Sequence, residues 1–145
     1  LYVREALSPE ATTWVRENNQ ALPLTPFHDL ELRNALHLKE FRKEMGAEES
    51  AMILRRFHDH ELQGVYYRPA CDWAEVFQTS LYLSDKHTGR LGCRSLDILH
   101  VASALAMGAN RFLSLDKRQA GLAGLAGLRT EKLTRPAGGR RRSGR

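Results

Sequence analysis

The sequence predicts an α/β fold, because short strand-like runs alternate with helix-forming segments along the chain. Residues 21–25 and 111–115 are strand-like, and each run leads directly into a helix. In an open α/β sheet, the ends of the strands and the starts of the following helices meet at one edge, where ligands bind. Functional side chains are therefore expected at the starts of these helices.

Helix start and stop signals mark most of the remaining chain. Ser8-Pro9 and Thr25-Pro26 each place an N-cap residue before a proline, which is typical of the first turn of a helix. The other expected elements are a helix over residues 47–63, an extended run over 65–67, a helix over 71–84, a turn over 85–89, an apolar helix from residue 95 to Gly108, a helical segment over 122–128 and an edge strand over 128–133.

The most informative stretch, residues 94–116, contains two acids, Asp97 and Asp116. Ser95 is the expected N-cap of the apolar helix, so Asp97 falls in its first turn, where unpaired N–H groups favour a carboxylate. Asp116 follows the strand over residues 111–115. Taken alone, Asp97 is an ordinary helix N-terminal acid and Asp116 an ordinary cap of the next helix. Delivered together to one edge, the two acids are well placed to share a hard cation such as Mg²⁺ or Mn²⁺.

A third acid, Glu31, lies on the helix that begins after Thr25. The apolar positions 27, 30, 35, 38 and 41 recur at helical spacing and predict a buried stripe, and Glu31 falls on that stripe. A buried carboxylate is costly unless a cation or a hydrogen-bond partner compensates it. A salt bridge to Arg33, or to a basic group elsewhere, is the structural alternative to a functional role.

These segments together resemble a PIN domain, and within that family the VapC-like toxin ribonucleases of bacterial toxin–antitoxin pairs. The resemblance is carried by Thr-Pro with Glu31, by Ser-Leu-Asp97-Ile-Leu-His-Val-Ala, and by Phe-Leu-Ser114-Leu-Asp116. It implies a three-layer α/β/α fold with a parallel sheet, and a Mg²⁺- or Mn²⁺-dependent site that cuts RNA. Glu31, Asp97 and Asp116 match three acidic positions of the family, and Ser114 matches its small hydroxyl residue. The partners implied are an RNA substrate and an antitoxin protein; the sequence leaves open whether the chain forms a homodimer.

The chain departs from the family pattern at its start. Residues 1–9 resemble the segment that follows the family's first strand, which carries a further acid. We therefore expect the nuclease domain, residues 1–133, to lack that strand, and its sheet to have a gap between residues 21–25 and 111–115. A chain with this gap is expected to be poorly stable.

A mechanism follows from the expected site. Clustered carboxylates repel one another and stay ionised together only when a cation compensates them. The metal would lower the pKa of a bound water and offset the charge on the phosphate, which gives hydrolysis without a covalent intermediate. Glu31, Asp97 and Asp116 would bind the metal directly or through water, and Ser114 would hydrogen-bond a carboxylate or a metal-bound water.

Composition agrees with one cytoplasmic, globular domain. The chain has 145 residues, of which 42% are hydrophobic, and no apolar run approaches the length of a membrane span. Cys71 and Cys93 lack metal-ligand spacing and are expected to be free thiols. The net charge of +5 comes from five arginines in the tail over residues 134–145, which cannot pack a core and is expected to be disordered.

Other charged residues leave alternatives open. Four basic residues adjoin the acidic positions and are candidates to hold a phosphate: Arg33, Arg94, Lys117 and Arg118. His100, one turn after Asp97, either orients that acid or is structural. Two further functions stay open: a catalytically inactive module that binds an antitoxin through the Glu31 helix and the helix over 47–63, and a metal-dependent phosphatase acting on a small phosphate ester.

Overall fold

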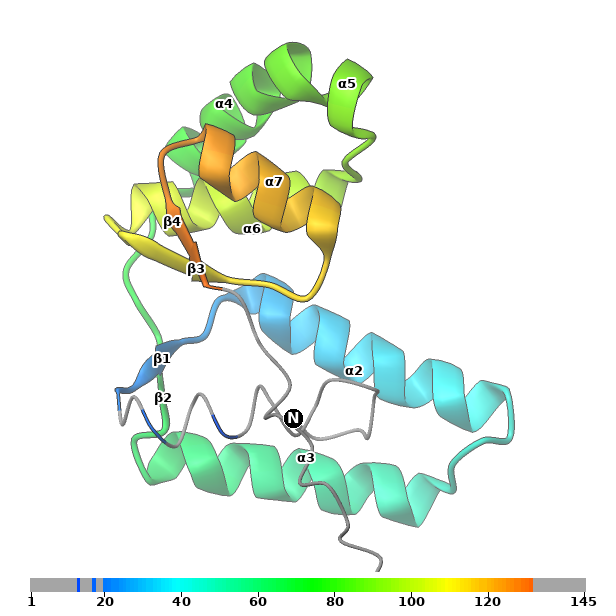
Figure 1. The fold of residues 1–145 in the computed structure, drawn as a ribbon. Helices are drawn as coiled ribbons and strands as arrows, with labels where there is room; N and C mark the ends of the chain where they lie inside the picture. The colour runs from blue at the N-terminus through cyan, green and yellow to red at the C-terminus, as the bar shows by residue number, and fades with distance from the viewer. Residues whose placement is uncertain (1–12, 14–16, 18–19, 132–145) are drawn as a thin grey trace, which may run out of the picture.

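A computed structural model describes Thr13, Glu17 and residues 20–131. The described chain consists of helices and short parallel strands, which confirms the mixed α/β class (Figure 1). Of the helix expected from Ser8, only Thr13 and Glu17 are described, and both are helical; the tail over residues 134–145 lies outside the described residues. None of the helices described is both long and apolar enough to span a membrane.

One half of the structure is built from β1 (Leu22–Pro23), α2 (Pro26–Phe41), α3 (Ala47–Leu62) and β2 (Tyr66–Tyr67). β1 and β2 pair in parallel, with Leu22 opposite Tyr66. α2 and α3 lie side by side and are joined at the end that points away from the strands (Figure 1). Leu24, Phe57 and Tyr66 form a small buried cluster that joins the two strands to α3.

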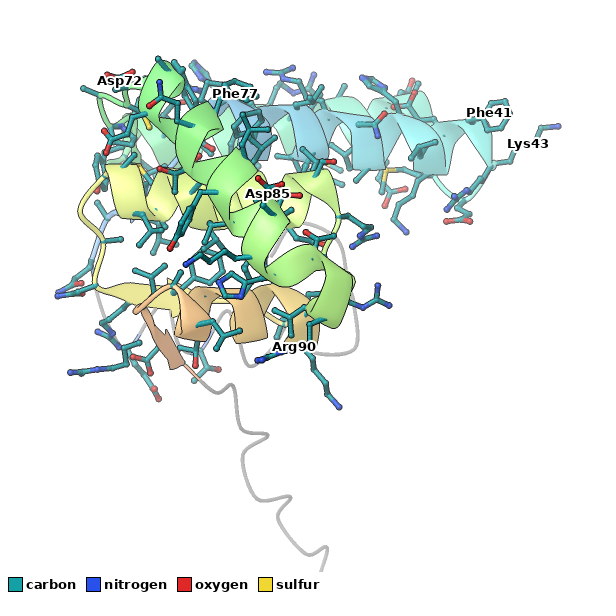
Figure 2. The ribbon with its side chains drawn as sticks, turned by 90° about the horizontal axis from the view of Figure 1, so that it is seen from above. Phe41, Lys43, Asp72, Phe77, Asp85 and Arg90 are labelled. Carbon is teal, nitrogen blue, oxygen red and sulfur yellow. The ribbon has the colours of Figure 1, made fainter. Side chains whose placement is uncertain are left out.

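The buried face of α2 differs from the predicted stripe. Leu30, Leu38 and Phe41 are expected to be buried, yet they are 59%, 41% and 84% exposed. The buried residue of α2 is Leu36, and Leu32, one turn earlier, packs against the cluster of the strands and α3. The far end of α2, where Figure 2 shows Phe41, projects away from the rest of the molecule. The stripe is therefore rotated and ends earlier than the apolar periodicity suggests.

The other half contains most of the buried core. Its elements are α4 (Trp73–Leu83), a π-helical turn (Ser84–Thr88), α5 (Gly89–Leu91), α6 (Ser95–Ala106), β3 (Arg111–Leu113), α7 (Lys117–Leu125) and β4 (Arg129–Glu131). β3 and β4 pair in parallel, with Arg111 opposite Arg129. The turn expected over residues 85–89 is wrong, because the chain stays helical until Gly92, whose φ of +66° suits a residue without Cβ.

α6 is the buried helix of this half, as its apolar sequence predicts. It packs against α4 and α7 (Figure 1), and Ile98, Val101 and Ala102 are almost fully buried. Its N-cap is Arg94 rather than the expected Ser95, so Asp97 is the third residue of the helix. The side chain of Asp97 reaches back to the N-cap backbone and satisfies an N–H group there.

The two strand pairs are separate sheets in the part of the chain that the structure describes. The N–H groups of Leu22 and Leu24 donate to the carbonyls of Val65 and Tyr67, so the hydrogen bonds of β1 go to the β2 side. The gap expected between residues 21–25 and 111–115 is therefore present among the described residues. The core is divided in the same way, with one apolar cluster in each half. A single sheet in a three-layer fold stays a prediction.

Candidate functional site

A cavity of about 570 Å³ lies between the two halves, lined by β1, α2, α6, β3 and the loop from β3 to α7. All four residues predicted for the site line this cavity: Glu31, Ser114, Asp97 and Asp116. They come from the second turn of α2, the first turn of α6 and the loop that follows β3. The rule that strand ends and helix starts meet at one edge accounts for Asp97 and Asp116 lining the same cavity.

Asp97 is held in place by the residue that begins its own helix. Its Oδ2 accepts a hydrogen bond from the backbone N–H of Arg94 at 2.9 Å and from the Nε of the same residue at 3.3 Å. The residue is only 6% exposed. These contacts compensate the carboxylate and fix its direction at the cavity wall.

Asp116 is the N-cap of α7, which confirms its interpretation as a cap of that helix. Its Oδ1 accepts from the N–H groups of Arg118 at 2.7 Å and Gln119 at 3.2 Å. The hydrogen bond from Gln119, then that from Arg118, and then the nearby charges of Arg94 and Arg118 lower the pKa of this carboxyl. Asp116 is therefore a carboxylate at neutral pH, with its second oxygen directed toward Arg94.

Arg94 joins the two aspartates. Its Nε lies 3.3 Å from Asp97 Oδ2 and its Nη2 lies 3.7 Å from Asp116 Oδ2, so one guanidinium compensates both carboxylates. Its side chain is 74% exposed. Among the four basic residues predicted to hold a phosphate, Arg94 lines the cavity, whereas Arg33, Lys117 and Arg118 are absent from the lining formed by described residues.

Ser114 hydrogen-bonds the loop and the helix that follow it. Its hydroxyl donates to Gln119 Oε1 at 2.5 Å and accepts from the backbone N–H of Asp116 at 3.1 Å. A carboxylate is therefore not the partner of this hydroxyl, which instead holds the loop that carries Asp116; the alternative partner, a metal-bound water, stays a prediction. The reason is local: a serine two residues before a helix cap lies within reach of the cap's backbone.

Glu31 is partly exposed and is paired with a histidine. Its side chain is 43% exposed, and its Oε2 pairs with Nε2 of His100, which is 8% exposed. The structural alternative for Glu31, a pairing with a basic group elsewhere in the chain, is confirmed, and that group is His100 rather than Arg33. His100 pairs with Glu31 and not with Asp97, in agreement with its structural interpretation. The rings of Phe27 and His28 pack against the imidazole of His100.

His28 lines the cavity beside this pair, a position that sequence reasoning missed. Its Nδ1 accepts from the backbone N–H of Thr25 at 3.1 Å and lies 2.8 Å from the Thr25 hydroxyl. Desolvation, and then the adjacent His100, lower the pKa of His28 to about 4, although the residue keeps an exposed edge. Because Nδ1 must accept, the neutral ring carries its hydrogen on Nε2. His28 is three residues before Glu31, and this spacing is the signal that places both on one face of α2.

Ser103 is a second cavity residue that sequence reasoning missed. It is 1% exposed, it lines the cavity, and its hydroxyl has no hydrogen-bond partner within the described part of the chain. Buried hydroxyls are normally paired, because an unpaired one costs about 1–3 kcal/mol. Ser103 follows His100 by three residues on α6, which is again the helical spacing that could have identified it.

The three acids share a cavity but do not form a ligand cluster. Carboxylate oxygens are the ligands that Mg²⁺ and Mn²⁺ prefer, so the donor chemistry of Glu31, Asp97 and Asp116 fits such an ion. Among the described residues, however, no three His, Cys, Asp or Glu side chains are close enough together to hold a metal. The contacts explain why: Arg94 occupies the space between the aspartates, and His100 holds Glu31.

The two cysteines play no part in this arrangement. Cys71 and Cys93 are both free thiols, as predicted. Cys93 is buried behind the aspartates, and burial, followed by the charges of Asp97 and Asp116, raises the pKa of its thiol. It is therefore a protonated, unreactive group at neutral pH.

Comparison with known proteins leaves the family of this chain open. No protein-family model, no curated protein and no solved structure matches it.

Proposed function

We propose that this chain is a Mg²⁺- or Mn²⁺-dependent endoribonuclease, the cytoplasmic toxin of a toxin–antitoxin pair, built on a three-layer PIN-like domain. The observation that carries the proposal is that Glu31, Asp97 and Asp116 come from three separate elements and line one cavity. Three acids that face one cavity of an α/β protein can serve phosphodiester hydrolysis when a divalent cation is bound.

The chain's own residues have distinct roles in this proposal. Asp97 and Asp116 would hold the cation, and Glu31 would hold it directly or through water. The bound cation supplies Lewis-acid chemistry that activates water and offsets charge on the scissile phosphate. Ser114 positions Asp116 through its backbone N–H.

In the proposed mechanism, His100 holds the Glu31 carboxylate in position through a hydrogen bond. The pair holds the Glu31 carboxylate at the cavity wall, where it accepts a hydrogen bond from the imidazole. His28 is neutral and adds no positive charge to compete for the acid. Because His100 is buried and packed by Phe27, the carboxylate it holds stays in one position.

The test incubates the protein with a labelled single-stranded RNA and Mn²⁺. Wild type should cut the RNA, and cutting should stop with EDTA. Asp97→Asn should lower the rate by about 100-fold or more, since even residues that only orient a ligand contribute about 10- to 100-fold. Asp85→Asn, an exposed acid away from the cavity (Figure 2), should leave the rate unchanged.

The same assay separates the alternatives. If a small phosphate ester is hydrolysed with the same dependence on Asp97 and the RNA is left intact, the protein is a phosphatase. Full RNA cleavage by Asp97→Asn would refute the site.

A second candidate function, an interaction module, is favoured by the helical hairpin. α2 and α3 expose large apolar side chains, among them Phe41 at 84%, Leu62 at 73% and Met52 at 58%. Exposed apolar groups on adjacent helices are typical of surfaces that bind a partner helix. Absence of cleavage with every metal and substrate, together with antitoxin binding that Phe41→Ser weakens, would support this function over the nuclease.

A further inference from the structure

We propose that α2 pairs two copies of this chain, packed antiparallel about a two-fold axis at Asn34. One face of the helix carries Phe27, Leu30, Asn34, Leu38 and Phe41, at intervals of three, four, four and three residues. The same residue types therefore recur at equal distances on either side of Asn34. The inference goes beyond the proposed function, and none of these five residues lines the cavity.

A two-fold axis is the symmetry that this palindromic stripe fits. In a two-fold interface the same patch serves both copies, so residue i contacts residue j and residue j contacts residue i. When two α2 helices cross antiparallel at Asn34, Leu30 of each copy faces Leu38 of the other. The two Asn34 amides meet at the axis, and each has the donors and the acceptor to bind the other. The stripe is complementary to itself, which identifies a second copy as its occupant.

Most of the stripe faces solvent in the part of the chain that the structure describes. Phe27 is half-buried, because its ring packs edge-on against Trp73 of α4 with the centroids 5.3 Å apart. The rest of the stripe is exposed: Leu30, Asn34, Leu38 and Phe41. Leu36, on the buried face of the same helix, is fully covered. α2 therefore has a second apolar face that its own chain covers only at the start.

α4 supplies the surface that would receive the most exposed aromatic ring. The antiparallel register brings Phe41 of one copy to Phe27 of the other, and Phe27 lies against Trp73. Phe77 follows Trp73 by one turn of α4 and is 53% exposed (Figure 2). Aromatic rings gathered in this way pack edge-to-face or offset, which adds to the gain from burial alone. Because of the symmetry, this contact occurs twice in the dimer.

The exposed apolar area matches what a dimer of moderate affinity buries. At about 200 Å² per aromatic side chain, Phe41 at 84% and Phe77 at 53% together expose roughly 270 Å². Leu30 and Leu38 bring this to roughly 370 Å² per copy. That value is close to the apolar share of an interface of about 600 Å² per partner, the lower end for specific complexes. We expect a dissociation constant of about 10 µM, so that the chain is a monomer near ~1 µM and a dimer near ~100 µM.

The first test is sedimentation velocity over this concentration range. The mass of wild type should rise from the 16.4 kDa of one chain toward twice that value. Leu38→Glu puts two charges into the interface and should raise the dissociation constant by about 30-fold or more. Leu125→Glu makes the same change at a leucine of similar exposure on α7, outside the stripe, and should leave the dissociation constant unchanged.

The second test locates the axis by oxidative cross-linking. Packed helices lie about 8–10 Å apart, so two cysteines at the axis come within disulfide range. Asn34→Cys should therefore form a covalent dimer on a non-reducing gel. Leu38→Cys should not, because its two copies lie about 12 Å apart along the helices. Wild type, with Cys71 and Cys93, gives the background.

Several results would overturn the inference. A wild type that stays monomeric at ~100 µM would leave the stripe to another protein. A dimer that survives Leu38→Glu, or one that Leu125→Glu weakens equally, would place the interface elsewhere. Cross-linking of Leu38→Cys as fast as Asn34→Cys would contradict the axis. Thermal unfolding of each variant establishes that it is folded.

Discussion

Protonation of His28 should destabilise the folded protein between about pH 6.5 and pH 4. The pKa of His28 is lowered from 6.5 to about 4, first by desolvation and then by His100. Between these two pH values, His28 is protonated in the unfolded chain but remains neutral in the folded chain. The free energy of unfolding therefore falls as the pH falls from 6.5 to 4, and the contribution of His28 is fully present above pH 6.5.

The magnitude follows from the size of the pKa change. One pKa unit corresponds to about 1.4 kcal/mol, so the upper bound is about 3.4 kcal/mol. The imidazole keeps an exposed edge, and solvent screening reduces this value to about 1–2 kcal/mol. Such a change is a large fraction of the stability of a small domain.

The assay compares His28→Gln with wild type by urea unfolding at pH 7.5, 6, 5 and 4.2. Glutamine three residues after a threonine N-cap can accept from the Thr25 N–H in place of Nδ1, so the helix start is preserved. The stability difference between the two proteins should shrink, or change sign, by about 1–2 kcal/mol as the pH falls. Because the acids titrate equally in both proteins, they cancel. A difference that is constant with pH would refute the reasoning.

Three further predictions concern packing, capping and thiol access. Leu36→Ala should lower the free energy of unfolding by about 2–5 kcal/mol, whereas Leu38→Ala, at 41% exposure on the same helix, should lower it far less. Equal losses of stability in urea unfolding would show that Leu38 is buried as the apolar periodicity predicts. Asp116→Ala should cost about 1 kcal/mol by removing the N-cap of α7, and Asp116→Asn should largely restore it, as thermal unfolding would show. Cys93 should react with a thiol reagent more slowly than Cys71, because Cys93 is the more deeply buried thiol; mass mapping of the first-labelled cysteine decides this.

Local signals in the sequence predicted local structure well. Thr25-Pro26 marks the start of α2, the glycine at 108 follows the end of α6, and Asp97 falls in the first turn of its helix. These features depend on residues within one turn of each other, so the chain alone determines them. The meeting of Asp97 and Asp116 at one cavity was also predictable, because it follows from the geometry of strand–helix units.

Contacts between distant segments were not predictable in this way. His100 is 69 positions from Glu31, and no spacing rule links α2 to α6. The bridge from Arg94 to Asp116 depends on how β3 and α7 pack against α6. The prediction that the apolar stripe of α2 is buried was wrong for the same reason. An apolar periodicity shows which residues share a face of a helix, but it does not show whether another element covers that face.

The most direct test of the proposed metal site is to replace the divalent cation by Fe²⁺ and let ascorbate and peroxide generate hydroxyl radicals at the place where it binds. The radicals cut the polypeptide within a few bonds of the ion, and mass spectrometry locates the cuts. We predict cuts near Glu31, Asp97 and Asp116 that excess Mn²⁺ suppresses and that Asp97→Asn abolishes. Cuts confined to other segments, or cuts that Mn²⁺ leaves unchanged, would contradict the claim that these three acids form one metal site.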